Sequence, residues 1–311
     1  MQGTISGEVL YGINTIYSVQ ADGALMQCRI KGKVLREAER SYNPIAPGDV
    51  VEVIPDTLSP REGLIAEVRA RRTVLSRWNK KGRAPQVLAA NADLAVCVTS
   101  PASPPFRPRF IDRLIVAASA GGLRPVVLLN KADLPLSADA EERLGHYARM
   151  GYTVHSCSAV RGQGLEELAQ MLRGLTAVFV GQSGVGKSSI LNSLFPGLGL
   201  RVGNVSAKHN RGSHTTNFSS LLLLEGGLRI IDTPGVRELE LADVLPEEVG
   251  YHFRDFVPFA GECEFQPCLH AGEPGCAVLA AVESGQIHAD RYESYRRIIQ
   301  ELQENRRPGN G

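Results

Sequence analysis

Two short polar motifs constrain the fold of this chain more than any other feature, because their order fixes how the strands must be connected. The Gly-rich loop Gly181–Ser188 follows the apolar run Ala177–Val180 and opens a helical pattern, as a phosphate-binding loop requires. The motif Asn130-Lys131-Ala132-Asp133 ends another apolar run and comes earlier in the chain. Nucleotide-binding domains that carry both motifs ordinarily place the phosphate loop first. The reversed order therefore indicates a circularly permuted domain.

The Gly-rich loop has the residue types that phosphate binding needs. Glycines let backbone N–H groups wrap around phosphate oxygens, the lysine neutralises the β- and γ-phosphates, and the serine ligates Mg²⁺. The pattern also occurs by chance in unrelated loops, but the strand before it and the helix after it favour phosphate binding. The residues expected to contact the nucleotide are Gly181, Gly184, Val185, Gly186, Lys187 and Ser188.

The earlier motif is suited to guanine recognition. The Asp133 carboxylate can accept hydrogen bonds from N1–H and the exocyclic amine of guanine, and adenine lacks both donors in that arrangement. Asn130 is expected to brace the loop, and the stem of Lys131 to cover the base. Ser158-Ala159 follows the next predicted strand, where backbone N–H groups can meet the guanine O6. Because ligands bind at the carboxyl ends of parallel strands, these motifs should meet at one edge of a sheet.

A further motif, Asp232-Thr233-Pro234-Gly235, ends a later strand. Asp232 is expected to hold Mg²⁺ through water, and the N–H of Gly235 to sense the γ-phosphate. Thr216, or its neighbour Thr215, is expected to complete the magnesium shell beside Ser188. In isolation such a motif is often a simple turn, but its position after the phosphate loop favours a nucleotide-sensing switch.

Val236 follows Gly235, and a valine cannot polarise a water molecule. Hydrolysis then needs another group, and His214 is the candidate because it adjoins Thr215. The alternative is an exposed histidine with no catalytic role. The expected catalytic residues are Lys187, His214 and Thr216.

Composition and charge favour a globular chain outside the membrane. The 311 residues, 43% of them hydrophobic, are enough for two or three domains. No apolar run approaches the roughly 20 residues needed to cross a bilayer, and no secretory signal is visible, so we expect a cytoplasmic location. Residues 61–83 hold eight basic and two acidic side chains, which suits a polyanion footprint or a solvated loop. Residues 237–311 instead carry fourteen acidic and seven basic side chains.

The pattern of apolar residues divides the chain into four segments. Residues 1–72 alternate apolar and polar residues in short runs, which predicts a small β-barrel, with the OB-fold as one option. Residues 73–90 are predicted to be a basic linker. Residues 91–236 alternate strands and helices, which predicts a parallel α/β sheet, with one hairpin around Gly226-Gly227. Residues 237–311 are predicted to be mostly helical, with helices over 246–255, 277–284 and 291–305.

Three cysteines and one histidine cluster in the last segment, as Cys263-x4-Cys268-x-His270-x5-Cys276. In a chain without a signal peptide, such a cluster favours a metal over disulfides. Three thiolates and an imidazole suit one closed, tetrahedral Zn²⁺ site with a structural role, since four protein ligands leave no open position for catalysis. The alternative is three buried cysteines beside a histidine.

Together these motifs resemble those of the circularly permuted, small-ribosomal-subunit-dependent GTPases of the RsgA (YjeQ) family. The similarity covers nearly the whole chain and also includes Ser189, His214-Thr215-Thr216 and the run Val236-Arg237-Glu238. It implies an N-terminal OB-fold barrel, a central permuted P-loop GTPase domain and a C-terminal zinc domain. It implies guanine recognition by the Asn-Lys-Ala-Asp motif and phosphate binding by Gly184–Ser189. It further implies GTP hydrolysis stimulated by the small ribosomal subunit, in the late maturation of that particle.

Three classes of function are compatible with these motifs. The leading one is a monomeric GTPase that binds rRNA through the barrel and the segment 61–83 and serves as an assembly checkpoint. The alternative is a nucleotide-gated binding protein that turns over little GTP. A comparison of the wild type with His214→Ala, in subunit binding and in stimulated GTP hydrolysis, separates the two. The third class, a metabolic phosphotransferase on a phosphate-loop fold, is disfavoured because Asp133 is suited to reading guanine. Because the strand ending at Asp232 leads into the last segment, we also expect the nucleotide state to act on that segment.

Overall fold

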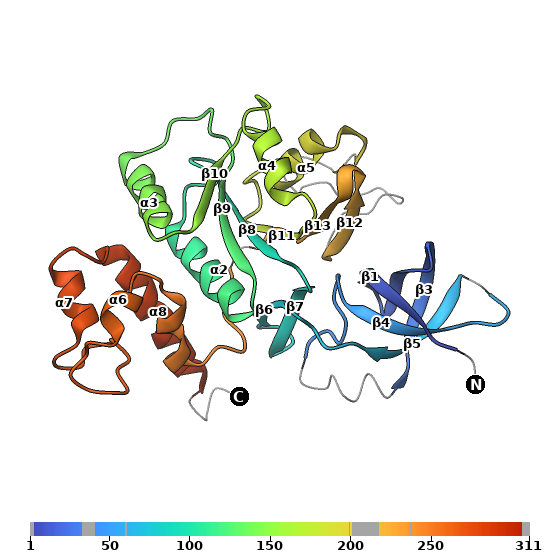
Figure 1. Cartoon of the computed structure of the whole chain (residues 1–311), viewed down its shortest axis with the longest axis horizontal. Helices are drawn as coiled ribbons and strands as arrows, with labels where there is room; N and C mark the ends of the chain where they lie inside the picture. The colour runs from blue at the N-terminus through green and yellow to red at the C-terminus, as the bar shows by residue number, and fades with distance from the viewer. Residues whose placement is uncertain are drawn as a thin grey trace.

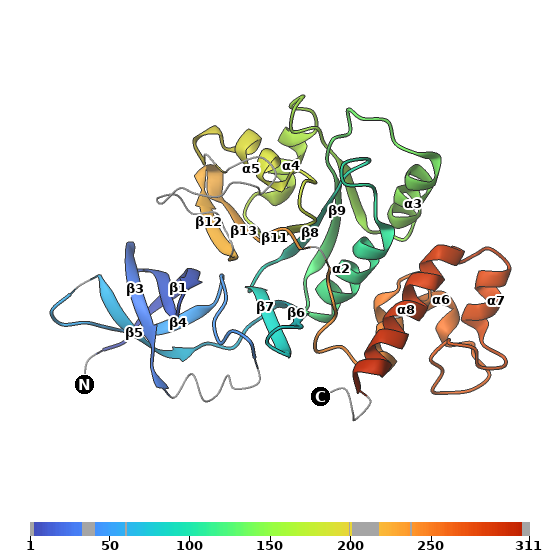
Figure 2. The same ribbon diagram turned by 180° about the vertical axis from the view of Figure 1, so that it is seen from behind.

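The computed structural model describes residues 3–32, 41–59, 61–198, 200, 218–236 and 238–306. A six-stranded sheet lies at the centre, with a small barrel on one side and a helical C-terminal segment on the other (Figure 1). The view from behind shows the same arrangement, with the barrel and the C-terminal helices at opposite ends (Figure 2). Among the described residues, no helix combines the length and the apolarity that crossing a membrane requires.

The N-terminal strands close into the predicted barrel. The strands are β1 (Ile5–Ile13), β2 (Ile16–Ala21), β3 (Ala24–Ile30), β4 (Val50–Pro55) and β5 (Glu62–Val68). They pair in the order β1-β2-β3-β5-β4, and β1 pairs with β4 to close the ring. Alternate side chains fill the interior, among them Met26 and Cys28 of β3 and Val51 and Val53 of β4. A five-stranded barrel of this kind is the architecture expected of an OB-fold.

The central sheet has the mixed topology that the sequence predicts. Its strands are β8 (Leu94–Thr99), β9 (Arg124–Leu129), β10 (Thr153–Ser156), β11 (Thr176–Gly181), β12 (Ser220–Leu224) and β13 (Leu228–Asp232). They lie in the order β10-β9-β8-β11-β13-β12. All neighbours are parallel except β12 and β13, which form the predicted antiparallel hairpin through the short 3₁₀ turn η2 (Glu225–Gly227).

Different helices cover the two faces of this sheet, and the alternation of side chains along each strand explains how. In β8, Val96 packs on the side of α4 and α5, whereas Cys97 packs on the side of α2 and α3. Both residues are buried, as expected of a parallel strand covered on both faces. The helices are α2 (Pro108–Ala120), α3 (Ala138–Arg149), α4 (Leu165–Leu172) and α5 (Lys187–Leu194), with the short turn η1 (Pro196–Leu198) after α5.

The structure differs from the sequence prediction over residues 73–90. This segment, predicted to be a basic linker, contains an antiparallel hairpin of β6 (Val74–Asn79) and β7 (Ala84–Ala90). The basic turn Lys80-Lys81-Gly82-Arg83 dominates the composition and obscures the apolar residues on either side. Leu75 is fully buried in the same hydrophobic cluster as α2, so the hairpin packs on the central domain.

The C-terminal segment is helical, as predicted, but its first helix is not an α-helix. Residues Pro246–His252 form a 3₁₀ helix (η3) instead of the predicted helix over 246–255. Gly250 lowers the α-helical propensity there, and the N–H of Phe253 donates to the Gly250 carbonyl to end the turn. The remaining helices are α6 (Val257–Ala260), α7 (Ala277–Glu283) and α8 (Ala289–Arg306).

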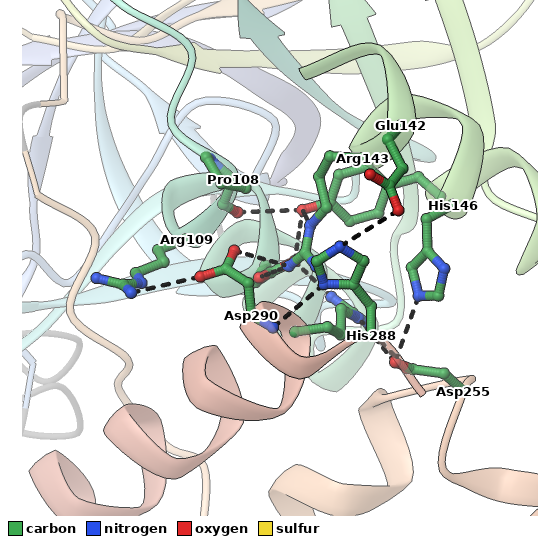
Figure 3. A network of polar contacts seen from close by, with 11 residues as sticks. Pro108, Arg109, Glu142, Arg143, His146, Asp255, His288 and Asp290 are labelled. Carbon is green, nitrogen blue, oxygen red and sulfur yellow. Dashed lines mark hydrogen bonds and ion pairs between the residues drawn. The ribbon is translucent and has the colours of Figure 1, made fainter. Parts of the chain in front are cut away.

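A buried ionic network joins this segment to the central domain. Asp112 of α2 is fully buried and accepts hydrogen bonds from Arg143 of α3 (2.7 Å), Arg291 of α8 (2.5 Å) and the hydroxyl of Tyr147 (2.6 Å). Asp255 lies 3.3 Å from the guanidinium of Arg291 on its other side. Figure 3 shows how side chains of α3, the start of α8 and the loop before α6 converge there. The C-terminal segment is thus fixed to α2 and α3 by charges as well as by apolar contacts.

The chain that follows Gly235 does not run freely into the C-terminal helices. The backbone N–H of Trp78 in β6 donates to the carbonyl of Glu240 (3.0 Å), and the Ser76 hydroxyl donates to Asp243 (3.3 Å). Leu239 is buried in the core shared with α2. The segment after Gly235 therefore passes against the β6–β7 hairpin before it reaches the last domain.

The barrel contacts the central sheet near the edge that β13 and β12 form. Arg229 of β13 donates to the hydroxyl of Thr176 (2.9 Å) and forms an ion pair with Glu8 of β1. The rings of Tyr11 and Phe218 lie 5.6 Å apart between β1 and the approach to β12. These contacts place the barrel beside the strand that follows residues 201–217.

Candidate functional site

The predicted nucleotide-binding motifs meet at the carboxyl edge of the central sheet. Asn130 follows β9, Ser158 follows β10, the loop beginning at Gly181 follows β11, and Asp232 ends β13. Because these strands are parallel neighbours or lie one strand apart, their ends place all four motifs on one side of the sheet. The permuted order along the chain therefore does not separate the motifs in space.

Asn130 connects the base-reading motif to the other two loops. Its side-chain amide donates to the carbonyl of Val185 in the phosphate loop (2.9 Å), and its side-chain oxygen accepts the N–H of Ala159 (3.1 Å). Gly186 adopts φ 96°, and a Cβ there would stand 2.2 Å from the Asn130 amide nitrogen. Glycine is required at this position because both the backbone conformation and the space exclude a side chain.

Lys131 lies over the phosphate loop. Its ammonium group donates to the carbonyls of Gly184 (2.8 Å) and Ser103 (2.6 Å). Burial lowers the pKa of this lysine, while Asp133 opposes that shift. The two hydrogen bonds fix the direction of the lysine stem, which suits the predicted role of covering a base.

Asp133 is oriented by its neighbour across the edge of the sheet. The Ser158 hydroxyl donates to one carboxylate oxygen of Asp133 (2.5 Å), and this hydrogen bond lowers the pKa of the carboxyl. The Asp133 side chain is otherwise exposed and ionised at neutral pH. A carboxylate held in this way is preorganised to accept hydrogen bonds from a base.

The phosphate loop has the backbone shape that its glycines predict. Gly184 and Gly186 have φ values of 87° and 96°, and α5 begins directly after them at Lys187. The Lys187 ammonium donates to the carbonyl of Gly181 (2.8 Å) across the loop. Burial lowers the pKa of Lys187, while the nearby Asp232 opposes this shift.

Asp232 has the character of an ion ligand. It is 7% exposed, and one of its carboxylate oxygens is buried without a hydrogen-bond partner in the described part of the chain. Burial raises the pKa of Asp232 to about 6, and Lys187 moderates this increase. An orphaned carboxylate oxygen beside the phosphate loop fits the predicted Mg²⁺ role, because a bound cation would satisfy it.

The motif at Asp232–Gly235 is packed against the phosphate loop. A Cβ on Gly235 would lie 3.0 Å from the backbone nitrogen of Ser183, so a larger residue would push the two loops apart by a few tenths of an ångström. The N–H of Val236 donates to the carbonyl of Gly181 (3.2 Å), and the Val236 side chain is buried. The predicted residues His214, Thr215 and Thr216 lie outside the described residues.

The four predicted metal ligands converge in the C-terminal segment. The ligand atoms of Cys263, Cys268, His270 and Cys276 all lie within 4.8 Å of one another. The Cys263 sulfur is 3.5 Å from His270 Nδ1 and 3.9 Å from the Cys276 sulfur. In a tetrahedral zinc site with Zn–S bonds of ~2.3 Å, the ligand atoms stand about 3.7 Å apart. The cluster therefore fits a tetrahedral metal ion, and its atoms need little rearrangement to bind one.

The loop that carries these ligands is held from outside by α8. The hydroxyls of Tyr292 and Tyr295 donate to the carbonyls of His270 (2.8 Å) and Leu269 (2.5 Å). Burial disfavours the ionised form of Glu273, but hydrogen bonds from backbone N–H groups, including that of Leu269 (3.0 Å), lower its pKa overall. Hydrogen bonds of this kind orient metal ligands, which favours a preorganised metal site over three buried cysteines that lie beside a histidine by chance.

Two groups at the candidate nucleotide site were not predicted from the sequence. The Ser103 carbonyl belongs to a proline-rich loop, and no motif marks a backbone carbonyl. The prediction for Ser158-Ala159 concerned backbone N–H groups and not the Ser158 hydroxyl, although a serine facing an aspartate across two strand ends could have indicated a hydrogen bond.

Comparisons with known proteins agree with this geometry. The sequence model of the RsgA GTPase family matches residues 68–242. Small ribosomal subunit biogenesis GTPase RsgA of Chlorobaculum parvum is 40% identical over 312 residues, covering 98% of this chain and 100% of that protein. The protein of the same name from a Geobacillus strain is 38% identical, covering 96% of this chain and 98% of its own.

Two solved structures share the architecture as a whole. YjeQ from Thermotoga maritima has 32% identity and a TM-score of 0.74, covering 96% of this chain and 99% of that one. YloQ, a circularly permuted GTPase, has 29% identity and a TM-score of 0.69, covering 98% of this chain and 96% of that one. The permuted motif order, the site at one sheet edge and these full-length similarities lead to one conclusion: the chain is a GTPase that belongs to the RsgA family of circularly permuted GTPases.

Proposed function

We propose that this GTPase acts in the biogenesis of the small ribosomal subunit and hydrolyses GTP faster when bound to that particle. The observation that carries the proposal is the 40% identity to a small ribosomal subunit biogenesis GTPase over nearly the whole of both chains. A match of that extent includes the barrel and the metal-binding segment as well as the nucleotide site. All three parts are thus proposed to serve the same task.

In the proposed nucleotide complex, the base and the phosphates occupy the two ends of one site. Asp133 accepts hydrogen bonds from guanine, the stem of Lys131 covers the ring, and the N–H of Ala159 approaches O6. The backbone of Gly184–Ser189 surrounds the phosphates, and Lys187 leaves the Gly181 carbonyl to neutralise the β- and γ-oxygens.

A magnesium ion bound with the nucleotide would neutralise charge on the β- and γ-phosphates. Ser188 and Thr216 are its proposed direct ligands, and Asp232 would hold it through water. The buried apolar side chain of Val236 cannot orient a water molecule. His214 is the proposed substitute, and we propose that turnover is slow until contact with the particle brings this group into use.

Contact with rRNA is proposed for exposed basic residues of the barrel more than for those residues of segment 61–83 that already form ion pairs. Within that segment Arg69, Arg71, Arg72 and Lys80 already form ion pairs with acidic residues of this chain. Paired arginines offer less charge to a phosphate backbone than unpaired ones. Exposed basic residues of the barrel, such as Arg29 of β3, are the better candidates for salt-sensitive phosphate contacts.

The proposal is tested by GTP turnover of the wild-type chain with purified small subunits, with large subunits and without particles. We expect stimulation by small subunits alone, and a loss of that stimulation in His214→Ala while GTP binding persists. Turnover that is the same under all three conditions would refute a particle-stimulated GTPase. If the wild type and His214→Ala bind the subunit alike and neither is stimulated, the chain is instead a nucleotide-gated binding protein.

A further inference from the structure

A cavity of about 650 Å³ borders the phosphate loop and is not part of the nucleotide site described above. Its walls come from the start of α2, the β6–β7 hairpin, the segment after Gly235 and α8. A volume of this size is within the range of ~300–1,000 Å³ found for small-molecule sites. The cavity therefore has room for a ligand that contacts several parts of the protein at once.

Gln182 is the feature of this cavity that points most directly to a ligand. Its side chain lines the cavity and is only 9% exposed. In the described part of the chain, its side-chain amide makes no hydrogen bond, although the backbone carbonyl of the same residue accepts one from Val185. The amide atoms of Gln182 are not among the fully enclosed polar atoms of the described residues, so they face the open space of the cavity, where a ligand or water can hydrogen-bond them.

The N-terminus of α2 faces the same space and carries positive charge. No acidic residue occupies the first turn of this 13-residue helix, and no side chain caps it. Arg107 is the N-cap residue, is exposed and lines the cavity. Pro108 has no N–H and the N–H of Phe110 donates to the Arg107 carbonyl (3.1 Å), so the Arg107 guanidinium is the main attraction for an anion at this helix end.

Each acidic residue in the cavity wall lies in an ion pair, which weakens its repulsion of an anion, although Glu238 and Glu240 share the single charge of Lys80. Glu301 forms an ion pair with Arg113 (2.5 Å), and Asp290 with Arg109 (3.4 Å; Figure 3). Glu238 and Glu240 both pair with Lys80. Among the described cationic residues that line the cavity, Arg107 is left without an acidic partner.

Aromatic and apolar residues form the rest of the lining. Phe106 is partly exposed, whereas Phe110 and Leu239 are buried beneath it. A ring next to an arginine is a surface on which a nucleobase can stack, and such stacking is worth ~1–3 kcal/mol per base. The lining thus combines an anion site, a stacking surface and a free amide.

We propose that this cavity is a second ligand site that takes a nucleoside phosphate, either as a free nucleotide or as one residue of an RNA strand. The phosphate lies at the N-terminus of α2 beside Arg107, the base packs on Phe106, and Gln182 hydrogen-bonds a polar edge of the ligand. An occupant contacts the phosphate loop through Gln182 and the segment after Gly235 through Leu239. It is therefore placed to influence the nucleotide site without entering it.

The test uses the full-length chain saturated with GDP and Mg²⁺, so that the first site is filled. Isothermal titration calorimetry measures the binding of AMP, inorganic phosphate and a short single-stranded oligoadenylate to the wild type. Arg107→Glu should weaken binding about tenfold or more, because it replaces an attractive charge with a repulsive one. Arg124→Glu is the matched control, since Arg124 is also exposed but lies at the start of β9, outside the cavity. Phe106→Ala should weaken AMP more than inorganic phosphate.

The outcomes separate the two sources of the ligand. Binding of AMP that depends on Arg107 supports the site with a free nucleotide as its occupant. Binding of the oligonucleotide alone, with the same dependence on Arg107, supports it with RNA as the occupant. If no probe binds the wild type, or if Arg107→Glu and Arg124→Glu bind alike, the proposal is overturned. Because GDP fills the first site throughout, these results do not depend on the proposed role in ribosome biogenesis.

Discussion

Replacement of Asp112 by asparagine should be among the most destabilising single changes outside the two ligand sites. Asp112 is completely buried and its carboxylate accepts hydrogen bonds from Arg143, Arg291 and Tyr147. Asparagine keeps the size of the side chain but removes its charge and turns an NH₂ group toward donors. The two arginines, 3% and 0% exposed at their side chains, then lose their shared counter-ion.

The expected cost follows from the burial of these charges. Removing one partner from a buried ionic network costs ~3–5 kcal/mol, because the remaining charge is left without compensation. Asp255 still contacts Arg291 at 3.3 Å, so the lower part of that range is expected. Asp290→Asn is the matched control at the rim of the same network, since Asp290 is 37% exposed, lies 3.4 Å from Arg109 and 3.8 Å from Arg143, and should contribute ~0–1 kcal/mol.

Urea unfolding of the two variants and the wild type provides the measurement. Far-UV circular dichroism reports on the helices, and the fluorescence of the only tryptophan, Trp78, reports on the hairpin that packs beside α2. Asp112→Asn should lower the unfolding midpoint by both probes, and Asp290→Asn should leave it nearly unchanged. Equal midpoints for the two variants would refute the idea that the buried network holds the C-terminal segment in place.

Two further predictions concern the proposed ions. Metal analysis should find one Zn²⁺ per chain, and chelation or Cys268→Ser should unfold the C-terminal helices, as followed by their hydrogen exchange; helices that stay protected without metal would contradict a structural site. The folded-state pKa of Asp232 is raised to about 6, so its contribution to the stability of the nucleotide-free chain is present at low pH and is lost as the pH rises through 6. Magnesium needs the ionised form, so the gain in GTP affinity from Mg²⁺ should shrink as the pH falls through 6, whereas Asp232→Asn should show a small gain at every pH.

The sequence predicted where most residues of the candidate nucleotide site lie, because they follow strands whose direction the α/β alternation fixes. Once β9, β10 and β11 are parallel neighbours in one sheet, the positions of Asn130, Ser158 and Gly181 follow from their places at the strand ends. The convergence of the candidate metal ligands was also predictable, since close spacing in the chain limits how far apart they can lie. Local patterns of this kind need no knowledge of how the domains pack.

The contacts between domains could not be predicted from such local patterns. Arginines in helices are usually exposed, and nothing in the sequence indicates that Arg143 and Arg291 both turn inward to Asp112, which is far from each in the chain. The β6–β7 hairpin was missed for a related reason, because its basic turn outweighs its apolar strands in composition. Both features depend on partners that only the folded chain brings together.

The hairpin also changes how the switch can act on the rest of the protein. From the sequence, we expected the segment after Gly235 to connect the nucleotide site only to the C-terminal domain. In the structure this segment is hydrogen-bonded to Trp78 of β6 and contributes Leu239 to the core shared with α2. A movement of Gly235 would therefore reach the hairpin as well as the C-terminal helices.

The central claim is that the permuted motifs form one guanine-nucleotide site, and exchange of its base specificity tests this most directly. Binding of GDP and xanthosine diphosphate is measured by calorimetry for the wild type and for Asp133→Asn. The wild type should prefer GDP, and the variant should lose GDP affinity and gain affinity for the xanthosine nucleotide, because its amide can donate to the O2 of xanthine. If Asp133→Asn binds GDP as the wild type does, Asp133 does not read the base and the motifs do not form the site described.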